Sequence, residues 1–360
     1  MNIILWIAIG LALVAAVAFL MRRTRASRDV DVVAPPDPET APQPAAAPAP
    51  TRVAAGPSPQ QRVNALALDD PRVADAQYSP EPAAMQLLMN AGQEFARIGT
   101  EPRYTPRRPS LLPQLMEAVN DEDASLKALS RIIAQDPSLT GELLRTANSA
   151  LYRVSGNPIE SVERAAAMLG TQGLRTLIAA SLVKPLAADT TQGRGRFGEI
   201  AWEYSLYSAS AAEAWASRAQ DCDPFTAHLL GLMYGLGAVA VCRVMIDLGR
   251  QAGQPAEPAV IGYALETQAA VTAKRIAASW GLSERTQEAL EAQSAAAPSM
   301  QSTPLARALA FGRLSGALIV LCRHQRSDEA ESTALLAAAG YTGPALERIW
   351  DRLLRAYVRP

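Results

Sequence analysis

The sequence predicts an all-α protein: a multi-helix domain preceded by one transmembrane helix and a Pro/Ala-rich linker. Nearly half of the 360 residues are hydrophobic, yet much of that share is alanine and only 5% are aromatic. Such a composition favours close-packed helices over a β-rich core. Apolar residues recur at helical spacing, and several segments begin with a capping residue followed by proline. No segment shows the sustained alternation of a strand.

The formal net charge is −1, so general electrostatic attraction to nucleic acid is not supported, and we expect no nucleic-acid partner. The three cysteines are widely spaced and form no CxxC pair. They fit thiols in a reducing compartment better than a disulfide framework or a zinc site.

Residues 3–21 carry no charge, and a run of arginines follows them: Arg22, Arg23, Arg25 and Arg28. A helix of this length spans about 28 Å, close to the hydrocarbon core of a bilayer. A secretory signal has its positive charge before the apolar run, whereas here it comes after. We therefore expect residues 1–28 to be a single-pass anchor in the cell inner membrane, with the bulk of the chain cytoplasmic. A cleaved signal peptide is the alternative, because small alanines lie within the apolar run.

Residues 29–105 are predicted to be a linker that ends in a short pre-domain helix. Prolines and alanines dominate residues 34–59, which favours an extended, semi-rigid tether. Residues 60–82 are polar and give no clear prediction. Residues 83–98 place apolar side chains on one face and predict the short helix.

The most specific local pattern lies in residues 136–152. Asp136 followed by Pro137 predicts a helix start, because the carboxylate can accept from first-turn amides and proline presets the first helical φ. The apolar positions Leu139, Leu143, Leu144 and Ala147 share one face. The helix is expected to end near Asn148.

Further helices are expected on both sides of this segment. Capping and stop signals include Ser161, Gly170, Thr171, Asp223, Ser283 and Thr303. Residues 225–246 are apolar nearly all round, which predicts the central buried helix. The other predicted helices cover residues 111–119, 125–134, 162–169, 199–219, 263–280 and 305–322.

A series of short motifs resembles the HDOD family, the HD-related output domain of bacterial signalling proteins. The resemblance covers residues 106–305 and rests on Leu112-Pro113, Ile132-Ile133, Asp136-Pro137-x-Leu139, Asn148-Ser149-Ala150, Ile159-x-Ser161, Leu169-Gly170 and Leu174-Arg175. It implies a regulatory module. Its expected partners are signalling proteins: a sensor kinase, a response regulator or a cyclic-nucleotide enzyme.

The same resemblance identifies what this chain lacks. The HD superfamily hydrolyses phosphate esters with metal ions held by histidines and an adjacent His-Asp pair. Here Tyr204 stands at the first histidine position, Tyr234-Gly235 at the His-Asp position, and Ala292-Gln293 where many relatives have a histidine pair. A hydrolytic metal needs imidazole and carboxylate donors. We therefore expect no enzymatic activity, no metal and no cofactor.

The two histidines of the chain do not replace the missing ligands. His228 lies in an apolar segment with no carboxylate at helical spacing, which is typical of a core histidine. His324 lies beside Arg323 and Arg326, a cationic setting that disfavours metal binding.

Two regions are candidate interaction sites. One is the groove left by the missing metal site, near Tyr204, Tyr234 and Glu266; pairing for structure is the alternative role for Glu266. The other is residues 136–152, which include Asp136 and Asn148.

Residues 306–360 are predicted to form C-terminal helices that pack on the domain or serve as an interface. The last helix starts at Pro344 and has an apolar face made by Leu346, Ile349, Trp350, Leu353, Leu354 and Tyr357. Docking on the domain itself is favoured. A partner or homodimer interface is the alternative, because aromatics such as Trp350 and Tyr357 often anchor interfaces.

These observations favour a membrane-anchored, non-catalytic signalling module that acts through protein interaction. Two alternatives stay open. One is a divergent metal-dependent phosphohydrolase of nucleotides or cyclic nucleotides that uses carboxylates. The other is a nucleotide-sensing domain without turnover.

Overall fold

The computed structural model describes residues 56–75, 78–106, 126–134, 137–148, 158–188, 196–294 and 302–359. Regular structure within these ranges is helical, apart from one isolated bridge between Ile98 and Glu101. The predicted all-α class is therefore confirmed. The predicted anchor at 3–21 and the predicted helix at 111–119 lie outside the described residues.

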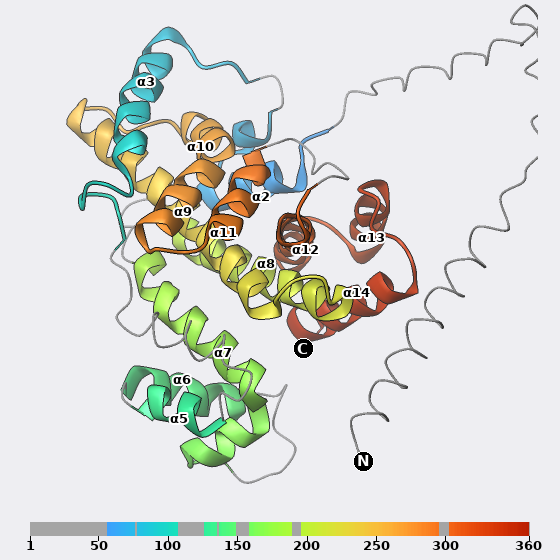
Figure 1. Ribbon diagram of the computed structural model, residues 1–360. Coiled ribbons are helices and arrows are strands. Elements are labelled where there is room, and N and C mark those ends of the chain that lie inside the picture. Colours follow the sequence, from blue (N-terminus) through green and yellow to red (C-terminus); the bar gives the residue numbers. More distant parts are fainter. Residues whose placement is uncertain are drawn as a thin grey trace, which may run out of the picture. The chain divides into compact units, whose positions relative to one another are not determined.

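The helices follow one another along the chain as shown in Figure 1. Before the main domain come α2 (Pro59–Leu68), the 3-10 turn η1 (Pro71–Ala74) and α3 (Pro82–Arg97). The first part of the domain contains α5 (Leu126–Ala134), α6 (Pro137–Ala147) and α7 (Val162–Ala188). The second part contains α8 (Phe197–Ala219), α9 (Pro224–Gln251), α10 (Pro258–Ser279), α11 (Glu284–Glu291) and η2 (Ala292–Ser294). The chain continues through α12 (Pro304–Arg323), α13 (Glu329–Ala338) and α14 (Pro344–Tyr357).

Helices α8, α9, α10 and α12 form the core of the domain, with α8 packed against both α9 and α12 and α10 packed against α9. As predicted, α9 is buried almost all round. Its start has the expected cap, because the Asp223 carboxylate accepts from the Thr226 amide at 2.6 Å and Pro224 follows. Thr303 likewise caps α12, but Ser283 makes no side-chain bond to the first-turn amides of α11.

Small residues let these core helices approach closely. A Cβ atom at Gly231 of α9 would lie 2.5 Å from the Cα of Ala209 in α8. Only glycine fits such a backbone contact without displacing a helix. The alanine- and glycine-rich composition therefore sets the helix spacing in the core.

Helices α5 and α6 pack against each other and against α7, which also contacts α8 and α9. The predicted break at Gly170 is present as a kink inside α7, where the glycine has a φ of +69°. Glycine is favoured there because the left-handed region is strained for other residues. The predicted cap also forms, since Ser161 Oγ accepts from the Arg164 amide at 3.3 Å.

The segment before the domain is more ordered than the sequence indicated. Residues 83–98 form α3 nearly as predicted, but residues 59–68 form α2, although the predicted tether ended at residue 59 and residues 60–82 gave no clear prediction. Ser58 and Gln61 close a reciprocal capping box at its start. Val63, Ala67 and Leu68 are buried, and the helix packs on α8, α10 and α12. The expectation of a linker up to the short helix is therefore corrected for α2 and η1, whose apolar side chains belong to the core.

Two described helices, α9 and α12, are long and apolar enough to span a membrane by length and composition alone. Their most apolar windows are 89% and 72% buried inside the domain. This is the pattern of core helices.

Candidate functional site

Tyr204 of α8 and Tyr234 of α9 meet in the interior of the domain. Their ring centroids lie 6.3 Å apart and the ring planes are inclined by 73°, an edge-to-face contact. Both residues are buried, with 3% and 4% of their surfaces exposed. Two of the positions where the HD superfamily is expected to hold metal ligands are thus brought together.

A guanidinium from α12 lies between these positions. Arg313 Nη2 donates to the hydroxyl of Tyr234 at 2.7 Å, and the guanidinium carbon stands 4.0 Å from the centroid of the same ring. Arg313 Nη1 donates to the main-chain oxygen of Gln293 at 3.2 Å and to its Oε1 at 3.3 Å. One cation therefore joins α9, η2 and α12.

Gln293 is held in place from both sides. Its side-chain amide nitrogen donates to the carbonyl oxygens of Ala289 and Ala306, each at 3.1 Å, while Oε1 faces Arg313. The side chain is 8% exposed. Its amide nitrogen is therefore hydrogen-bonded within the protein, and its Oε1 accepts from a guanidinium.

Gly235, which stands at the expected aspartate position, has no space for a side chain. A Cβ atom built on it would lie 1.7 Å from Oγ of Ser205 and 2.6 Å from Ser205 Cβ. Ser205 is itself fixed by a 2.6 Å hydrogen bond from its hydroxyl to the Ala201 carbonyl. The volume that a carboxylate would need is filled by α8.

The electrostatics of this group, which we call the Arg313 cluster (Tyr204, Tyr234, Gln293 and Arg313), are those of one cation among neutral groups. Burial raises the pKa of Tyr204 to about 12, although the positive charge of Arg313 acts to lower it. Tyr204 is therefore neutral near pH 7, while a guanidinium stays charged. Across the described ranges, no three His, Cys, Asp or Glu side chains gather as metal ligands do.

Both histidines lie next to a glutamate of α8. His228, fully buried in α9, has Nδ1 2.9 Å from Oε2 of Glu213, although the ring is not aligned for a hydrogen bond. His324 has Nε2 2.8 Å from Oε2 of Glu203. For His228 we expected no carboxylate at helical spacing on its own helix. The acid beside it, Glu213, comes from the neighbouring helix α8. The purely cationic setting expected for His324 is likewise corrected by Glu203.

Glu266 does not join the tyrosines. It is exposed on α10, and its Oε2 accepts a hydrogen bond from Gln61 of α2 at 3.2 Å. Although the residue as a whole is exposed, partial desolvation of its carboxylate raises the pKa of Glu266, and the Gln61 bond acts in the opposite direction. The expected grouping with Tyr204 and Tyr234 is therefore replaced by a contact with the pre-domain helix.

Asn148 fastens the end of α6 to the start of α7. Its amide nitrogen donates to the carbonyls of Leu144 and Ile159, both at 2.8 Å, and its Oδ1 accepts from the Ile159 amide at 2.8 Å. These hydrogen bonds give Asn148 a structural role. Asp136, the other candidate of this segment, lies outside the described residues.

The C-terminal helix α14 docks on the domain, which is the role the sequence favoured. Trp350 is buried, and the Tyr357 ring packs on Tyr207 with centroids 4.6 Å apart. The Tyr357 hydroxyl donates to Ser210 Oγ at 2.8 Å. Both candidate interface aromatics are thus engaged within the chain.

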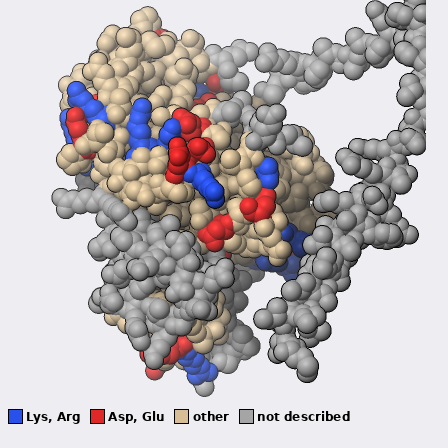
Figure 2. All heavy atoms as spheres, viewed as in Figure 1, with Lys and Arg blue, Asp and Glu red and all other residues tan. Residues whose placement is uncertain are grey.

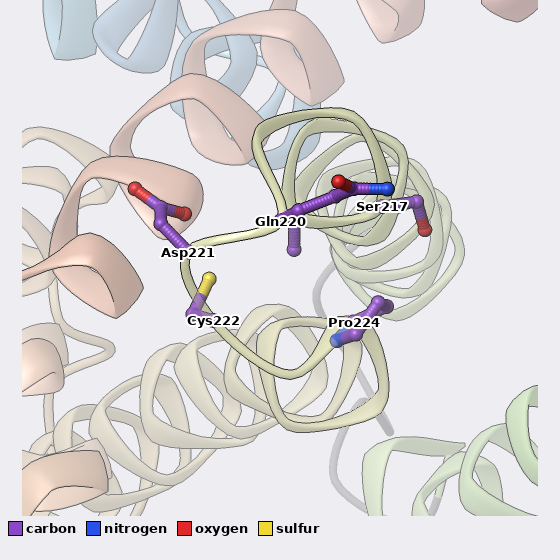
Figure 3. Close-up of a pocket in the computed structure, with 6 residues that line it drawn as sticks. Ser217, Gln220, Asp221, Cys222 and Pro224 are labelled. Atoms are coloured by element: carbon purple, nitrogen blue, oxygen red, sulfur yellow. The ribbon is translucent and has the colours of Figure 1, made fainter. Parts of the chain in front are cut away.

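A separate hollow of about 610 Å³ opens at the turn between α8 and α9 (Figure 3). Asp221 at its edge is paired with Arg307 of α12 at 2.8 Å. Burial raises the pKa of Cys222 to about 12, so this thiol is protonated and unreactive at neutral pH. The acid at the edge of the hollow is therefore paired, and its thiol is protonated.

On the face of the domain seen in Figure 2, acidic and basic side chains are interspersed among neutral ones. Over the described part of that face they form no continuous basic surface of the kind that tracks a phosphate backbone.

Arg313 is the residue that sequence reasoning missed. It is the one charged side chain between Arg307 and Arg323 in an otherwise apolar stretch of α12. A lone arginine inside a helix that must be buried was the available signal, because a buried charge requires an interior partner.

The comparisons with known proteins agree with this fold. The model of the HDOD domain family matches residues 105–296, more than half of the chain. The chain belongs to the HDOD family. The family match starts one residue before the expected domain and ends before α12.

Solved structures share the HDOD fold with this chain at low identity. An HDOD domain protein of unknown function from Geobacter sulfurreducens is 20% identical, with a TM-score of 0.53, covering 76% of this chain and 96% of that one. A proposed metal-dependent phosphohydrolase from Shewanella amazonensis SB2B is 17% identical, with a TM-score of 0.53, covering 77% and 100%. A proposed signal transduction protein from Marinobacter aquaeolei VT8 is 20% identical, with a TM-score of 0.50, covering 76% and 63%.

Among curated proteins, an uncharacterized protein of Treponema pallidum (strain Nichols) is 25% identical over 134 residues. The match covers 37% of this chain and a quarter of that protein. At these identities the likenesses establish the fold alone.

Proposed function

We propose that this HDOD protein is a membrane-anchored signalling module that works through protein interaction and not through hydrolysis. The observation that carries the proposal is the Arg313 cluster. Tyr234 and Gln293, two of the positions where HD hydrolases are expected to bind metal, accept hydrogen bonds from the Arg313 guanidinium. A fixed cation there takes up the acceptor groups that a metal ion would use and repels a second cation.

The neighbouring positions support the same conclusion. A hydrolytic metal needs carboxylate or imidazole donors and an open position for water. Gly235 offers no carboxylate, and Ser205 fills the space in which one would lie. Tyr204 is neutral and buried, and therefore a poor ligand for a divalent ion.

The signalling role and its location rest on other grounds. Membership of the HDOD family implies regulation, and one of the structural neighbours is a proposed signal transduction protein. The uncharged run at residues 3–21, followed by arginines, supports an inner-membrane anchor with the domain in the cytoplasm. We propose that the partner is a sensor kinase, a response regulator or a cyclic-nucleotide enzyme.

Two measurements on the full-length chain test the proposal. The first is turnover of nucleotides and cyclic dinucleotides with Mn²⁺ or Mg²⁺ by detergent-purified protein, for which we expect no product above a metal-free control. Metal-dependent turnover by the wild-type protein would instead establish a divergent phosphohydrolase. The second is crosslinking from native membranes followed by identification of bound proteins, for which we expect a signalling protein that is absent when residues 3–21 are deleted.

A further inference from the structure

Helix α3 has an apolar stripe that the rest of the domain leaves uncovered. The helix lies at the edge of the domain (Figure 1), and its inner side, which includes Ala91 and Phe95, is buried where it packs on α9 and α10. Beside this inner side, Met85 and Met89 are 42% and 62% exposed. Among the described residues, one further large hydrophobic side chain is exposed, Tyr263 of α10. Two of these three side chains therefore lie one turn apart on the same short helix.

The stripe continues through Gly92 and Ala96, which are also exposed and follow the two methionines at helical spacing. A Cβ atom added to Gly92 would have no atom within 4 Å. By contrast, a Cβ atom added to any glycine inside α9, α10 or α12 would lie 2.5 Å or less from a neighbouring atom. Glycine is unfavourable inside a helix unless close packing needs it. Gly92 therefore leaves a gap on the helix surface that no described segment fills.

The polar side of α3 forms its own contacts within the helix. Gln86 Nε2 donates to Asn90 Oδ1 at 3.1 Å, and Arg97 Nη1 donates to Glu94 Oε1 at 3.1 Å. These side chains lie on a different side of the helix from the two methionines. The side of α3 that lacks a neighbour is therefore the apolar stripe.

The order of side-chain sizes along the stripe is complementary to its own reverse, because two large residues are followed by two small ones. If a second α3 lies antiparallel to the first, Met85 faces the partner's Ala96 and Met89 faces the partner's Gly92. Both pairs are centred on the same point, between residues 90 and 91, so the contact has two-fold symmetry. A large side chain then meets a small one at every level, as close packing requires. In a parallel pair, Met would meet Met and Gly would meet Gly, which leaves a gap at Gly92.

The size of the contact sets its strength. Helix α3 has 16 residues and is therefore about 24 Å long and about 10 Å across. A contact of these dimensions is smaller than the roughly 1,200–2,000 Å² that stable interfaces bury. We therefore expect a weak dimer in dilute solution. The proposed membrane anchor would favour it, because two chains confined to one surface have a higher effective concentration.

We propose that Met85, Met89, Gly92 and Ala96 form a homodimer interface, at which the α3 helices of two copies of this chain pack antiparallel. The inference does not depend on the signalling role, because a hydrolase could pair in the same way. It also places the interface away from α14, whose Tyr357 is engaged within the chain.

Sedimentation of the full-length chain in detergent, over a series of protein concentrations, tests the proposal. We expect a reversible monomer–dimer equilibrium. Met89→Lys should raise the dimer dissociation constant at least about tenfold, because it removes a buried methionine from both halves of the contact. Gly92→Leu should weaken the dimer similarly, because it fills the position of the partner's Met89. Asn90→Lys is the matched control, since it adds the same charge one residue away but about 130° around the helix from the stripe, and it should leave the equilibrium unchanged.

These substitutions lie where no described segment covers α3, so each variant should fold, which circular dichroism checks. A wild type that stays monomeric at every concentration, in detergent and in lipid vesicles, would overturn the proposal, and the stripe would then be open to a different protein. A dimer that neither Met89→Lys nor Gly92→Leu weakens would overturn it as well, because that dimer must use another surface.

Disulfide trapping tests the antiparallel register. Met85→Cys and Ala96→Cys are each oxidised alone and then as a mixture, and the linked peptides are identified by mass spectrometry. In the antiparallel pair, two copies of the same variant hold their new cysteines about 16 Å apart along the helices, which is too far for a disulfide. The mixture should therefore give a disulfide between positions 85 and 96, and neither variant alone should link to itself. Self-linked variants without the mixed product would indicate a parallel pair and refute the register.

Discussion

Replacing Gly235 by alanine tests whether packing closes the position at which the HD superfamily is expected to place an aspartate. The added Cβ would lie 1.7 Å from Ser205 Oγ and 2.6 Å from Ser205 Cβ, inside van der Waals contact. Overpacking of this kind costs roughly 1–3 kcal/mol, occasionally more. The higher helix propensity of alanine offsets about 1 kcal/mol of that cost. The overlap with Ser205 Cβ places this site at the upper end of that range, so we expect Gly235→Ala to lower the free energy of unfolding by about 2 kcal/mol when the two effects are combined.

Two further variants isolate the cause. Removing the opposing side chain with Ser205→Gly leaves Ser205 Cα as the nearest atom, 3.4 Å from the new Cβ, so the double variant should recover most of the loss. Gly92→Ala on α3 is the control for propensity, because no atom lies within 4 Å of its added Cβ. It should be stabilised by up to about 1 kcal/mol.

The assay is chemical denaturation followed by circular dichroism, with a double-mutant cycle to extract the coupling between positions 205 and 235. The reasoning is refuted if Gly235→Ala unfolds like the wild type. It is equally refuted if the two substitutions are additive, because the loss would then not arise from their contact. The same clash predicts that a His-Asp pair rebuilt at 234 and 235 cannot form while Ser205 is present.

Three more predictions concern stability. Asn148→Ala removes three hydrogen bonds and leaves the Ile159 amide and carbonyl without their partner, so it should cost about 2–3 kcal/mol in denaturant titrations, whereas an exposed loop asparagine would cost almost nothing. Tyr357→Phe loses its bond to Ser210 and should cost about 1 kcal/mol by the same measurement; a wild-type stability would indicate that α14 is not docked. The pKa of Glu266 is raised by burial, so the folded protein holds this proton more tightly than the unfolded chain, and stability is lost as pH rises above 4.5. Glu266→Gln should flatten that part of the stability–pH curve, and an unchanged curve would contradict the desolvation of this carboxylate in the folded protein.

The helices could be predicted from sequence wherever local signals determine them. Asp223-Pro224 and Thr303-Pro304 mark helix starts through bonds within one turn, and Gly170 marks a break through its own backbone angle. Such interactions involve neighbours along the chain, so their pattern is visible in the sequence. The buried position of α9 followed in the same way from its apolar composition.

The cluster could be predicted only in part, because its contacts join distant segments. Tyr204 and Tyr234 were identified by their motif positions, but Arg313 lies 79 residues beyond Tyr234 in no recognised motif. The glutamate beside His228 likewise comes from another helix. Helix α2 was missed because its glutamines and arginine gave it a polar appearance, and its buried face is small.

Because α2 and α12 both cover the core, they limit where the protein can be truncated. A fragment limited to residues 105–296, the range of the family match, would lack α12 and its packing against α8. It would also lack α2, which packs on α8 and α10, and with it the Arg62–Glu331 ion pair that joins α2 to α13. Such a fragment would expose much of its hydrophobic core to solvent. We therefore expect a fragment that folds on its own to begin near Ser58 and to extend past Arg323.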